Sequence, residues 1–233
     1  MKNIGYILIL LSLSTAVLAM LTAEKEAKTP PIFNYSYQVN FEETFYSKKG
    51  EAKTTGKLFY DPLNNRERVD WANGRHNFFC SSILPNVDTP CISVTANNKR
   101  FQIFPERQQC CMCCTAERGC GILRPDWMKD GEYQGEEQID GVSYDKFHKT
   151  GATSEDYIFV TIDANQTEKK LLESNKDSGQ MAVYDLKTFE RKPLENSVFA
   201  LPSYCHEEKP SRCPLTSVCA LAEPGQYKVG RLG

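Results

Sequence analysis

The ten cysteines are the residues of this 233-residue chain that are best suited to chemistry. In a chain that enters an oxidising compartment, an even number of cysteines predicts a framework of disulfide bonds. Four of the ten crowd into the run Cys110–Cys114, where neighbours rarely reach the geometry of a relaxed disulfide. Each of these four therefore needs a partner outside the run, and the two cysteines left over pair with each other. The predicted disulfide cysteines are Cys80, Cys91, Cys110, Cys111, Cys113, Cys114, Cys120, Cys205, Cys213 and Cys219.

The pairing itself stays open, because many sets of partners satisfy this rule. We expect the Cys-rich segment 105–125 to be linked to the strand near Cys80 and to the C-terminal region around Cys205 and Cys213.

A thiolate site is the alternative chemistry for the same cluster. The doublets within Cys110–Cys114, together with Cys120, could hold zinc or Cu(I), or react through a free thiol. Zinc sites usually present two pairs of cysteines, each pair separated by two to four residues, and that spacing is missing here. We therefore favour structural disulfides and expect no metal site. A thiol- or metal-dependent function that uses Cys110–Cys120 remains the second alternative.

Other catalytic patterns are weak. The chain has three histidines, no Gly-x-Ser-x-Gly elbow and no His-Glu-x-x-His helix. The acidic pairs Glu42-Glu43 and Glu136-Glu137 are interpreted as solvated charges on a sheet, because neighbours on a strand point to opposite faces. We expect a protein that is not an enzyme and has no cofactor.

The first residues predict export. Lys2 precedes an uncharged apolar run over 4–18, and the run ends in small or apolar residues with Ala19 last. This pattern is typical of a signal peptide over 1–19. The alternative, a membrane anchor, needs about 20 apolar residues, which is longer than this run. No later stretch approaches that length, so we expect no transmembrane segment after signal removal and a location outside the cell or in the lumen of the endomembrane or vacuolar system.

Two further features agree with a secreted chain. Asn34 and Asn165 each begin an Asn-x-Ser/Thr triplet and are predicted glycosylation sites. The net charge of -2 provides no basic surface for a phosphate backbone, which argues against nucleic acid as a partner.

The elements that must position these residues are mostly strands. Residues 33–46 alternate between aromatic or apolar and polar side chains, which is typical of a long half-buried strand. Hairpin turns are predicted at Asn73-Gly74 and Asp140-Gly141. Further strands are expected near 52–60, 67–71, 77–80, 91–95, 100–104, 133–139, 142–149, 157–162, 168–172 and 181–186.

These patterns predict an all-β fold with few or no long helices. The antiparallel strands are expected to form either a curved sheet, as in a half-barrel, or a two-sheet sandwich, stapled by disulfides and carrying a Cys-rich loop. We expect one β domain over 20–205 with the Cys-rich insert at 105–125, followed by a disulfide-tied tail over 206–233.

A family resemblance adds to this interpretation. The stretch 56–61 (GKLFYD), followed by 66–70 (RERVD), resembles the strand–turn–strand of ependymin-related secreted proteins, and 199–205 (FALPSYC) is similar to the end of that module. The resemblance covers about residues 33–205. It implies a curved, open β-barrel shared with bacterial lipoprotein carriers, a glycosylated and disulfide-bonded chain, an apolar pocket for lipid and, in some members, bound calcium. The run Cys110–Cys114 departs from the family pattern, which leaves open whether the middle of the chain keeps the pocket.

The function follows from the aromatic strand and the resemblance. We predict a secreted or lumenal binding protein, not an enzyme, that holds an apolar, lipid-like ligand in a half-barrel pocket lined by Tyr35, Tyr37, Phe41 and Trp71. The same face could instead be an ordinary packed core, in which case the chain would be an extracellular structural or adhesive protein. The sequence specifies neither a protein partner nor an oligomeric state.

Overall fold

The computed structural model describes residues 28–48, 50–151 and 154–221, and contains one open antiparallel sheet of twelve strands. Eleven strands follow the order β6-β5-β4-β3-β2-β1-β11-β10-β9-β8-β7, and β12 pairs with the start of β1 beside β11. The strands are β1 (Tyr37–Ser47), β2 (Gly50–Asp61), β3 (Arg66–Trp71), β4 (Cys91–Ala96), β5 (Lys99–Phe104), β6 (Gln109–Thr115), β7 (Glu132–Ile139), β8 (Val142–Thr150), β9 (Glu155–Thr161), β10 (Glu168–Ser174), β11 (Ser178–Tyr184) and β12 (Glu190–Arg191).

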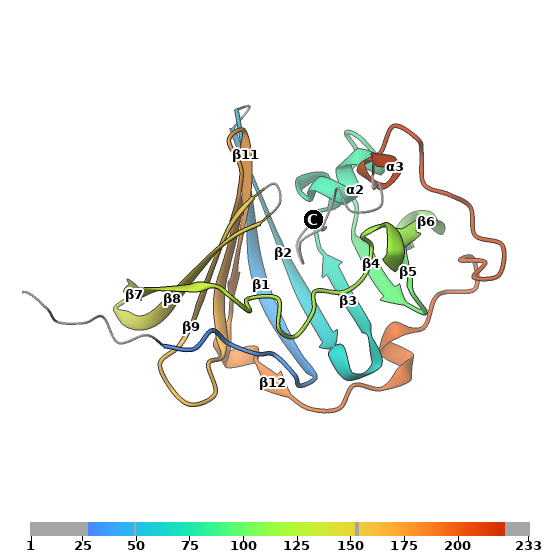
Figure 1. Cartoon of the computed structure of the whole chain (residues 1–233). Helices are drawn as coiled ribbons and strands as arrows, with labels where there is room; N and C mark the ends of the chain where they lie inside the picture. The colour runs from blue at the N-terminus through green and yellow to red at the C-terminus, as the bar shows by residue number, and fades with distance from the viewer. Residues whose placement is uncertain (1–27, 49, 152–153, 222–233) are drawn as a thin grey trace, which may run out of the picture.

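The sheet is strongly bent. Figure 1 shows β7–β9 and β3–β6 as two arms that meet at β1, β2 and β11. The predicted all-β, curved-sheet fold is therefore confirmed, and the sandwich alternative is wrong because the strands belong to a single sheet.

Helices are few and short in the described part of the chain. The α-helices are α2 (Phe78–Ile83) and α3 (Val218–Leu221), and the 3-10 helices are η1 (Pro62–Asn64), η2 (Gly74–His76), η3 (Pro105–Arg107), η4 (Ala116–Arg118), η5 (Leu186–Thr188) and η6 (Asn196–Phe199). No helix there is long and apolar enough to cross a membrane. The predicted signal peptide over 1–19 lies outside the described residues, as do the tail residues 222–233.

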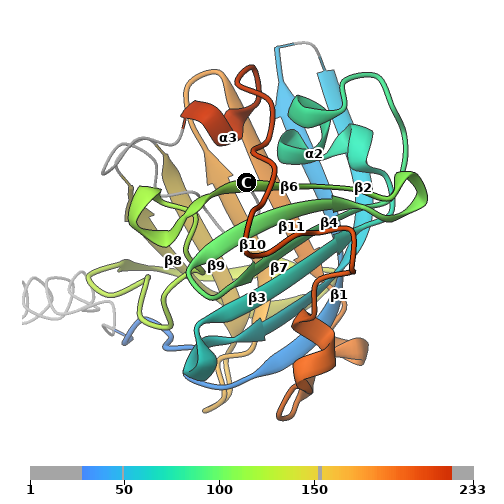
Figure 2. The same cartoon turned by 90° about the vertical axis from the view of Figure 1, so that its right-hand side faces the viewer.

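The main core lies on the inner, concave face of the sheet. Along β1, Tyr37, Val39 and Phe41 are buried at alternate positions, as the sequence pattern predicts. The segment between β6 and β7 covers this face: Tyr60 Oη donates to the carbonyl oxygen of Leu123 at 2.7 Å. Figure 2 shows α2 and α3 near one end of the sheet, where the backbone amide of Val218 donates to Ser82 Oγ at 3.2 Å.

A second core covers the outer face of one arm. Val94, Phe101, Ile103 and Met112 from β4–β6 pack there against residues of the segment after β12, among them Phe199. The strands β4–β6 are therefore covered on both faces.

One predicted strand is a helix. Residues 78–80 begin α2 instead of a strand, with Asn77 as the residue that caps it, and Asn73-Gly74 leads into η2 instead of a hairpin. The reason is capping: Asn77 Oδ1 accepts the backbone amides of Phe79 and Cys80 at 3.0 and 3.1 Å, which satisfies donors at the start of the helix.

All ten cysteines form disulfides. The pairs are Cys80–Cys91, Cys110–Cys205, Cys111–Cys213, Cys113–Cys219 and Cys114–Cys120. The rule that each member of the run finds a partner outside it, with the last two cysteines paired together, is confirmed. The expected link between the cluster and Cys80 is wrong, because α2 places Cys80 beside the start of β4.

The Cys-rich run is a strand, β6, although we expected a loop. Adjacent residues on a strand face opposite ways, so Cys110 packs with the second core while Cys111 packs against the main core. The tail lies along this strand, with an isolated parallel bridge between Met112 and Arg212. The thiolate alternative is wrong, because no cysteine is free to ligate a metal or react.

Candidate functional site

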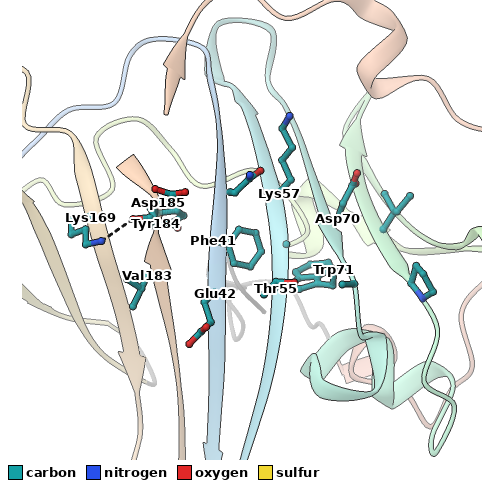
Figure 3. A pocket seen from close by; sticks show the side chains of 15 residues that line it. Phe41, Glu42, Thr55, Lys57, Asp70, Trp71, Lys169, Val183, Tyr184 and Asp185 are labelled. Carbon is teal, nitrogen blue, oxygen red and sulfur yellow. Dashed lines mark hydrogen bonds between the residues drawn. The ribbon is translucent and has the colours of Figure 1, made fainter. Parts of the chain in front are cut away.

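An open groove of about 750 Å³ crosses the centre of the sheet. We call it the outer groove; its lining runs from β10 and β11 over β1 and β2 to β3 and the start of β4 (Figure 3). The lining residues are Asn40, Phe41, Glu42, Thr55, Gly56, Lys57, Asp70, Trp71, Ala72, Pro90, Ile92, Lys169, Val183, Tyr184 and Asp185.

Strand register places the groove on the face opposite the main core. Glu42 pairs with Thr55 on one side and Val183 on the other, and paired residues of an antiparallel sheet share a face. Phe41, the neighbour of Glu42, is buried in the main core. The row through Glu42 therefore points outward, and the row through Phe41 points inward.

The floor of the groove is thin at Gly56. An added Cβ atom there would lie 2.4 Å from Phe41 Cζ and 2.4 Å from the carbonyl oxygen of Asp70. The Phe41 ring thus occupies the inner side of Gly56, which only a residue without a side chain permits.

The walls combine apolar and charged groups. Val183 and Ile92 are half-buried apolar residues on the outer face. Lys169 Nζ donates to the carbonyl oxygen of Tyr184 at 3.1 Å, and Lys57 Nζ lies 4.9 Å from the centroid of the Phe59 ring. Such a surface suits a ligand with both an apolar and a polar part.

The carboxylate of Asp70, which lines the groove, is held by an arginine on the same strand, β3. Arg68 donates to both carboxylate oxygens of Asp70, at 2.7 and 3.0 Å. This carboxylate is therefore fixed at the groove, with its charge largely balanced.

A buried carboxylate lies beneath the groove. Glu43 is only 1% exposed, and its carboxylate accepts Trp71 Nε1–H at 2.8 Å and Asn77 Nδ2–H at 3.1 Å. Burial raises the pKa of Glu43 to about 7, although the two hydrogen bonds oppose the shift. The prediction that Glu42 and Glu43 are both solvated is therefore wrong for Glu43 and correct for the exposed Glu42.

The structure brings together two of the four predicted pocket residues. Phe41 and Trp71 belong to the main core and reach the outer groove only as its floor, whereas Tyr35 and Tyr37 are not among its lining residues. The outer groove is therefore on the opposite face of the sheet from the pocket that the sequence predicts. Tyr37 is fully buried, stacks on Phe189 and donates to Glu168 Oε2 at 3.1 Å.

Tyr35 lies near both predicted glycosylation sites. Its hydroxyl accepts a hydrogen bond from Arg191 Nη2 at 2.9 Å, and Arg191 Nη1 donates to Asn165 Oδ1 at 3.2 Å. Asn34, the residue before Tyr35, and Asn165 are both exposed. The two triplets therefore lie at one end of the sheet, and their glycosylation stays a prediction.

The lining of the outer groove does not contain the side chains of a Ser–His or Cys–His pair. It has no cysteine, serine or histidine that could act as a nucleophile with its base. His148 instead binds Glu155 at 2.6 Å and stacks on Tyr157. Over residues 28–48, 50–151 and 154–221, no group of three or more side chains is arranged to hold a metal ion.

The alternating pattern of the first strand could have predicted that Glu43 is buried. Glu43 is in phase with Phe41 and Phe45 on the apolar side of the strand, which is where a buried side chain is expected. The groove itself has no comparable signal, because its outer residues look like ordinary exposed positions and come together only through the β1–β11 pairing.

A family model described as "Domain of unknown function (DUF8395)" matches residues 37–205, which is more than half of the chain. None of the curated proteins matches the sequence.

Several solved structures are similar at about 10% identity. An uncharacterized conserved protein from Thermus thermophilus has a TM-score of 0.46 and 9% identity, with 73% of this chain and 87% of that chain covered. A LolA superfamily protein from Nitrosomonas europaea has a TM-score of 0.39 and 11% identity, with 73% of this chain and 92% of that chain covered. The lipoprotein LppX from Mycobacterium tuberculosis has a TM-score of 0.41 and 11% identity, with 68% of this chain and 88% of that chain covered. These TM-scores are too low to support a shared function.

Proposed function

We propose that this chain, which belongs to the DUF8395 family, is a binding protein and not an enzyme, and that it holds an amphipathic, lipid-like molecule in the outer groove. The observation that carries the proposal is the groove of about 750 Å³ that joins apolar walls to charges of both signs. Its volume lies within the range of about 300–1,000 Å³ that is typical of small-molecule sites.

The apolar part of such a ligand would cross the strands. Val183, Thr55 and Ile92 offer an outward-facing path from β11 to β4, with the edge of Trp71 beneath it. A polar head would then lie beside the ammonium groups of Lys57 and Lys169 or the carboxylates of Glu42 and Asp185.

We further propose that the protein works outside the cell or in a lumen. Five disulfides are typical of an oxidising compartment, which supports this location. Kinship with ependymin-related proteins, and with it calcium binding, stays a prediction.

The test is a titration of the purified protein with a fluorescent fatty acid, together with native mass spectrometry of the protein as isolated. The variant Val183→Asp places a carboxylate on the apolar wall, and we expect about tenfold weaker binding, since burying a valine is worth roughly 1.5 kcal/mol or more.

Val142→Asp is the matched control, because Val142 is a strand valine that is 53% exposed and lies outside the groove. Equal affinities of the two variants, or a bare polypeptide that takes up no fatty acid, would contradict the proposed function.

A further inference from the structure

We propose a second binding site, for a neutral hydroxyl-rich ligand of the size of one sugar unit. It is a recess of about 300 Å³ between the β2–β3 turn, the β4–β5 turn and the segment from η6 to Glu207. We call it the amide recess; the polar side chains that line it are Asn64, Arg66, Asn97, Asn196 and Glu207. None of them lines the outer groove, so this site goes beyond the function proposed above and does not depend on it.

Each of the three asparagine side-chain amides in the recess uses one of its two polar atoms, Nδ2 or Oδ1, for hydrogen bonds within the protein. Asn64 Nδ2 donates to both carboxylate oxygens of Asp61, at 3.2 and 2.9 Å. Asn97 Nδ2 donates to Glu207 Oε1 at 2.7 Å. Asn196 is used the other way round, since its Oδ1 accepts from Arg66 Nη1 at 2.7 Å.

The other halves of these amides form a mixed set of hydrogen-bonding groups. Asn64 Oδ1 and Asn97 Oδ1 are acceptors, and Asn196 Nδ2 is a donor; none of the three atoms has a protein partner within the described residues. A hydroxyl group both donates and accepts, so a polyol can satisfy this set at once. An anion or a cation alone would satisfy only one kind of group.

Charge also favours a neutral ligand. The Arg66 guanidinium is already engaged: Nε lies 2.6 Å from Asp61 Oδ2, and Nη2 donates to the carbonyl oxygen of Leu194. Burial tends to raise the pKa of Asp61, but hydrogen bonds from Asn64, Ser36 and Arg66 outweigh it and hold that pKa below its usual value. The remaining charge is the exposed carboxylate of Glu207, which repels anions.

The recess is held in shape before any ligand binds. Asn65 Nδ2 donates to Asn98 Oδ1 at 3.0 Å and joins the two turns, and both residues have left-handed backbone, with φ of 51° and 59°. The Arg66 guanidinium lies 4.4 Å from the centroid of the Phe199 ring, and the disulfide Cys110–Cys205 fixes the segment after η6. Such preorganisation lowers the entropic cost of binding.

Apolar atoms complete the recess. Phe101 and Phe199 line the recess but are buried in the second core, so the half-buried Ala96 and Leu201 and the exposed Ala200 offer the apolar surface for the C–H face of a sugar ring. A volume of about 300 Å³ is at the lower limit for ligand sites, which fits one ring and excludes a long chain.

The experiment is saturation-transfer NMR on the intact protein with the methyl glycosides of mannose, galactose, glucose and N-acetylglucosamine, followed by titration of any that bind. We expect binding of at least one glycoside. The affinity should be about 5- to 10-fold weaker in Asn97→Gly, because this variant loses the hydrogen bond between Asn97 Oδ1 and the ligand. Asn86→Gly is the matched control, because both asparagines are exposed and have left-handed backbone (φ of 49° and 65°) that glycine adopts freely, and only Asn97 lines the recess.

A second variant separates binding from folding. Asn196→Asp keeps the acceptor for Arg66 and turns the remaining donor into an acceptor, so we expect the glycoside signal to fall while the thermal transition stays near that of the wild type. If no glycoside binds, or if Asn97→Gly and Asn86→Gly bind equally well, the proposed site is wrong. Loss of fatty-acid binding in the Val183 variant would not affect this result.

Discussion

Protonation of the buried Glu43 carboxylate affects both the floor of the outer groove and the start of α2. This carboxylate binds Trp71, which lines the groove, and Asn77, which caps the helix. Because burial raises its pKa from 4.5 to about 7, the folded protein binds this proton more tightly than the unfolded chain does. The stabilisation from Glu43 is therefore complete below pH 4.5 and is lost as the pH rises through about 7.

We predict that Glu43→Gln removes this pH dependence. Glutamine is uncharged at every pH and mimics the protonated carboxyl. The unfolding free energy of the wild type minus that of the variant should fall by about 2.5 kcal/mol from about pH 5 to about pH 8, measured by urea denaturation. Glu42→Gln, at the exposed neighbouring position, should keep the wild-type pH profile. A similar profile for wild type and Glu43→Gln would show that Glu43 titrates normally.

At the scale of the elements, alternation of side chains predicted the strands well. It succeeded because one face of almost every strand packs on a core, which forces a period of two on the sequence, as along β1. The alternation pattern failed at 77–80. There Asn77 donates to the buried Glu43 and accepts a backbone amide of the first turn of α2, and these contacts favour a helix over a strand. The contact with Glu43 joins residues 34 positions apart and is invisible in a local pattern.

The cap makes a testable prediction. Asn77→Ala removes both the acceptor for the amides of Phe79 and Cys80 and the donor to Glu43, so we expect the unfolding free energy to fall by roughly 1–3 kcal/mol. Asn77→Ser keeps a capping oxygen and should recover about 1 kcal/mol of this loss.

Ser81→Ala is the control on the same helix, because its hydroxyl makes only an exposed bond to the carbonyl oxygen of Phe78. The comparison is made by urea denaturation of all four proteins. Equal losses for Asn77→Ala and Asn77→Ser would mean that capping contributes little and that the bond to Glu43 dominates.

At the scale of the whole molecule, β6 is the strand to which the C-terminal segment is fastened. Three of its four disulfides run to the C-terminal segment, at Cys205, Cys213 and Cys219, over sequence separations of 95, 102 and 106 residues. The rule that adjacent cysteines need separate partners could be derived from the sequence, because it depends only on local geometry. Which partner each one takes depends on how the tail lies along β6, and no residue pattern encodes that.

The three disulfides between β6 and the C-terminal segment restrict the unfolded chain in overlapping ways, because each of them joins the same two segments. A single bond that closes a loop of about 100 residues lowers the entropy of the unfolded chain by an amount worth about 4.7 kcal/mol. With Cys111–Cys213 intact, however, Cys113–Cys219 closes only the short ring through positions 111–113 and 213–219, and its contribution drops to roughly 2–3 kcal/mol. The bond Cys114–Cys120, with a separation of 6 residues, should contribute roughly 2 kcal/mol.

We therefore predict that the double variants Cys113→Ala/Cys219→Ala and Cys114→Ala/Cys120→Ala lose nearly equal stability, within about 0.5 kcal/mol, although the sequence separations of the two bonds are 106 and 6. All four sulfurs are on buried residues, so the cavities left by alanine are similar and largely cancel in the comparison. Urea denaturation under non-reducing conditions measures both losses, and peptide mapping verifies that the other four bonds are intact in each variant. A loss about 2 kcal/mol larger for the Cys113/Cys219 variant would show that this bond closes its full loop independently of Cys111–Cys213.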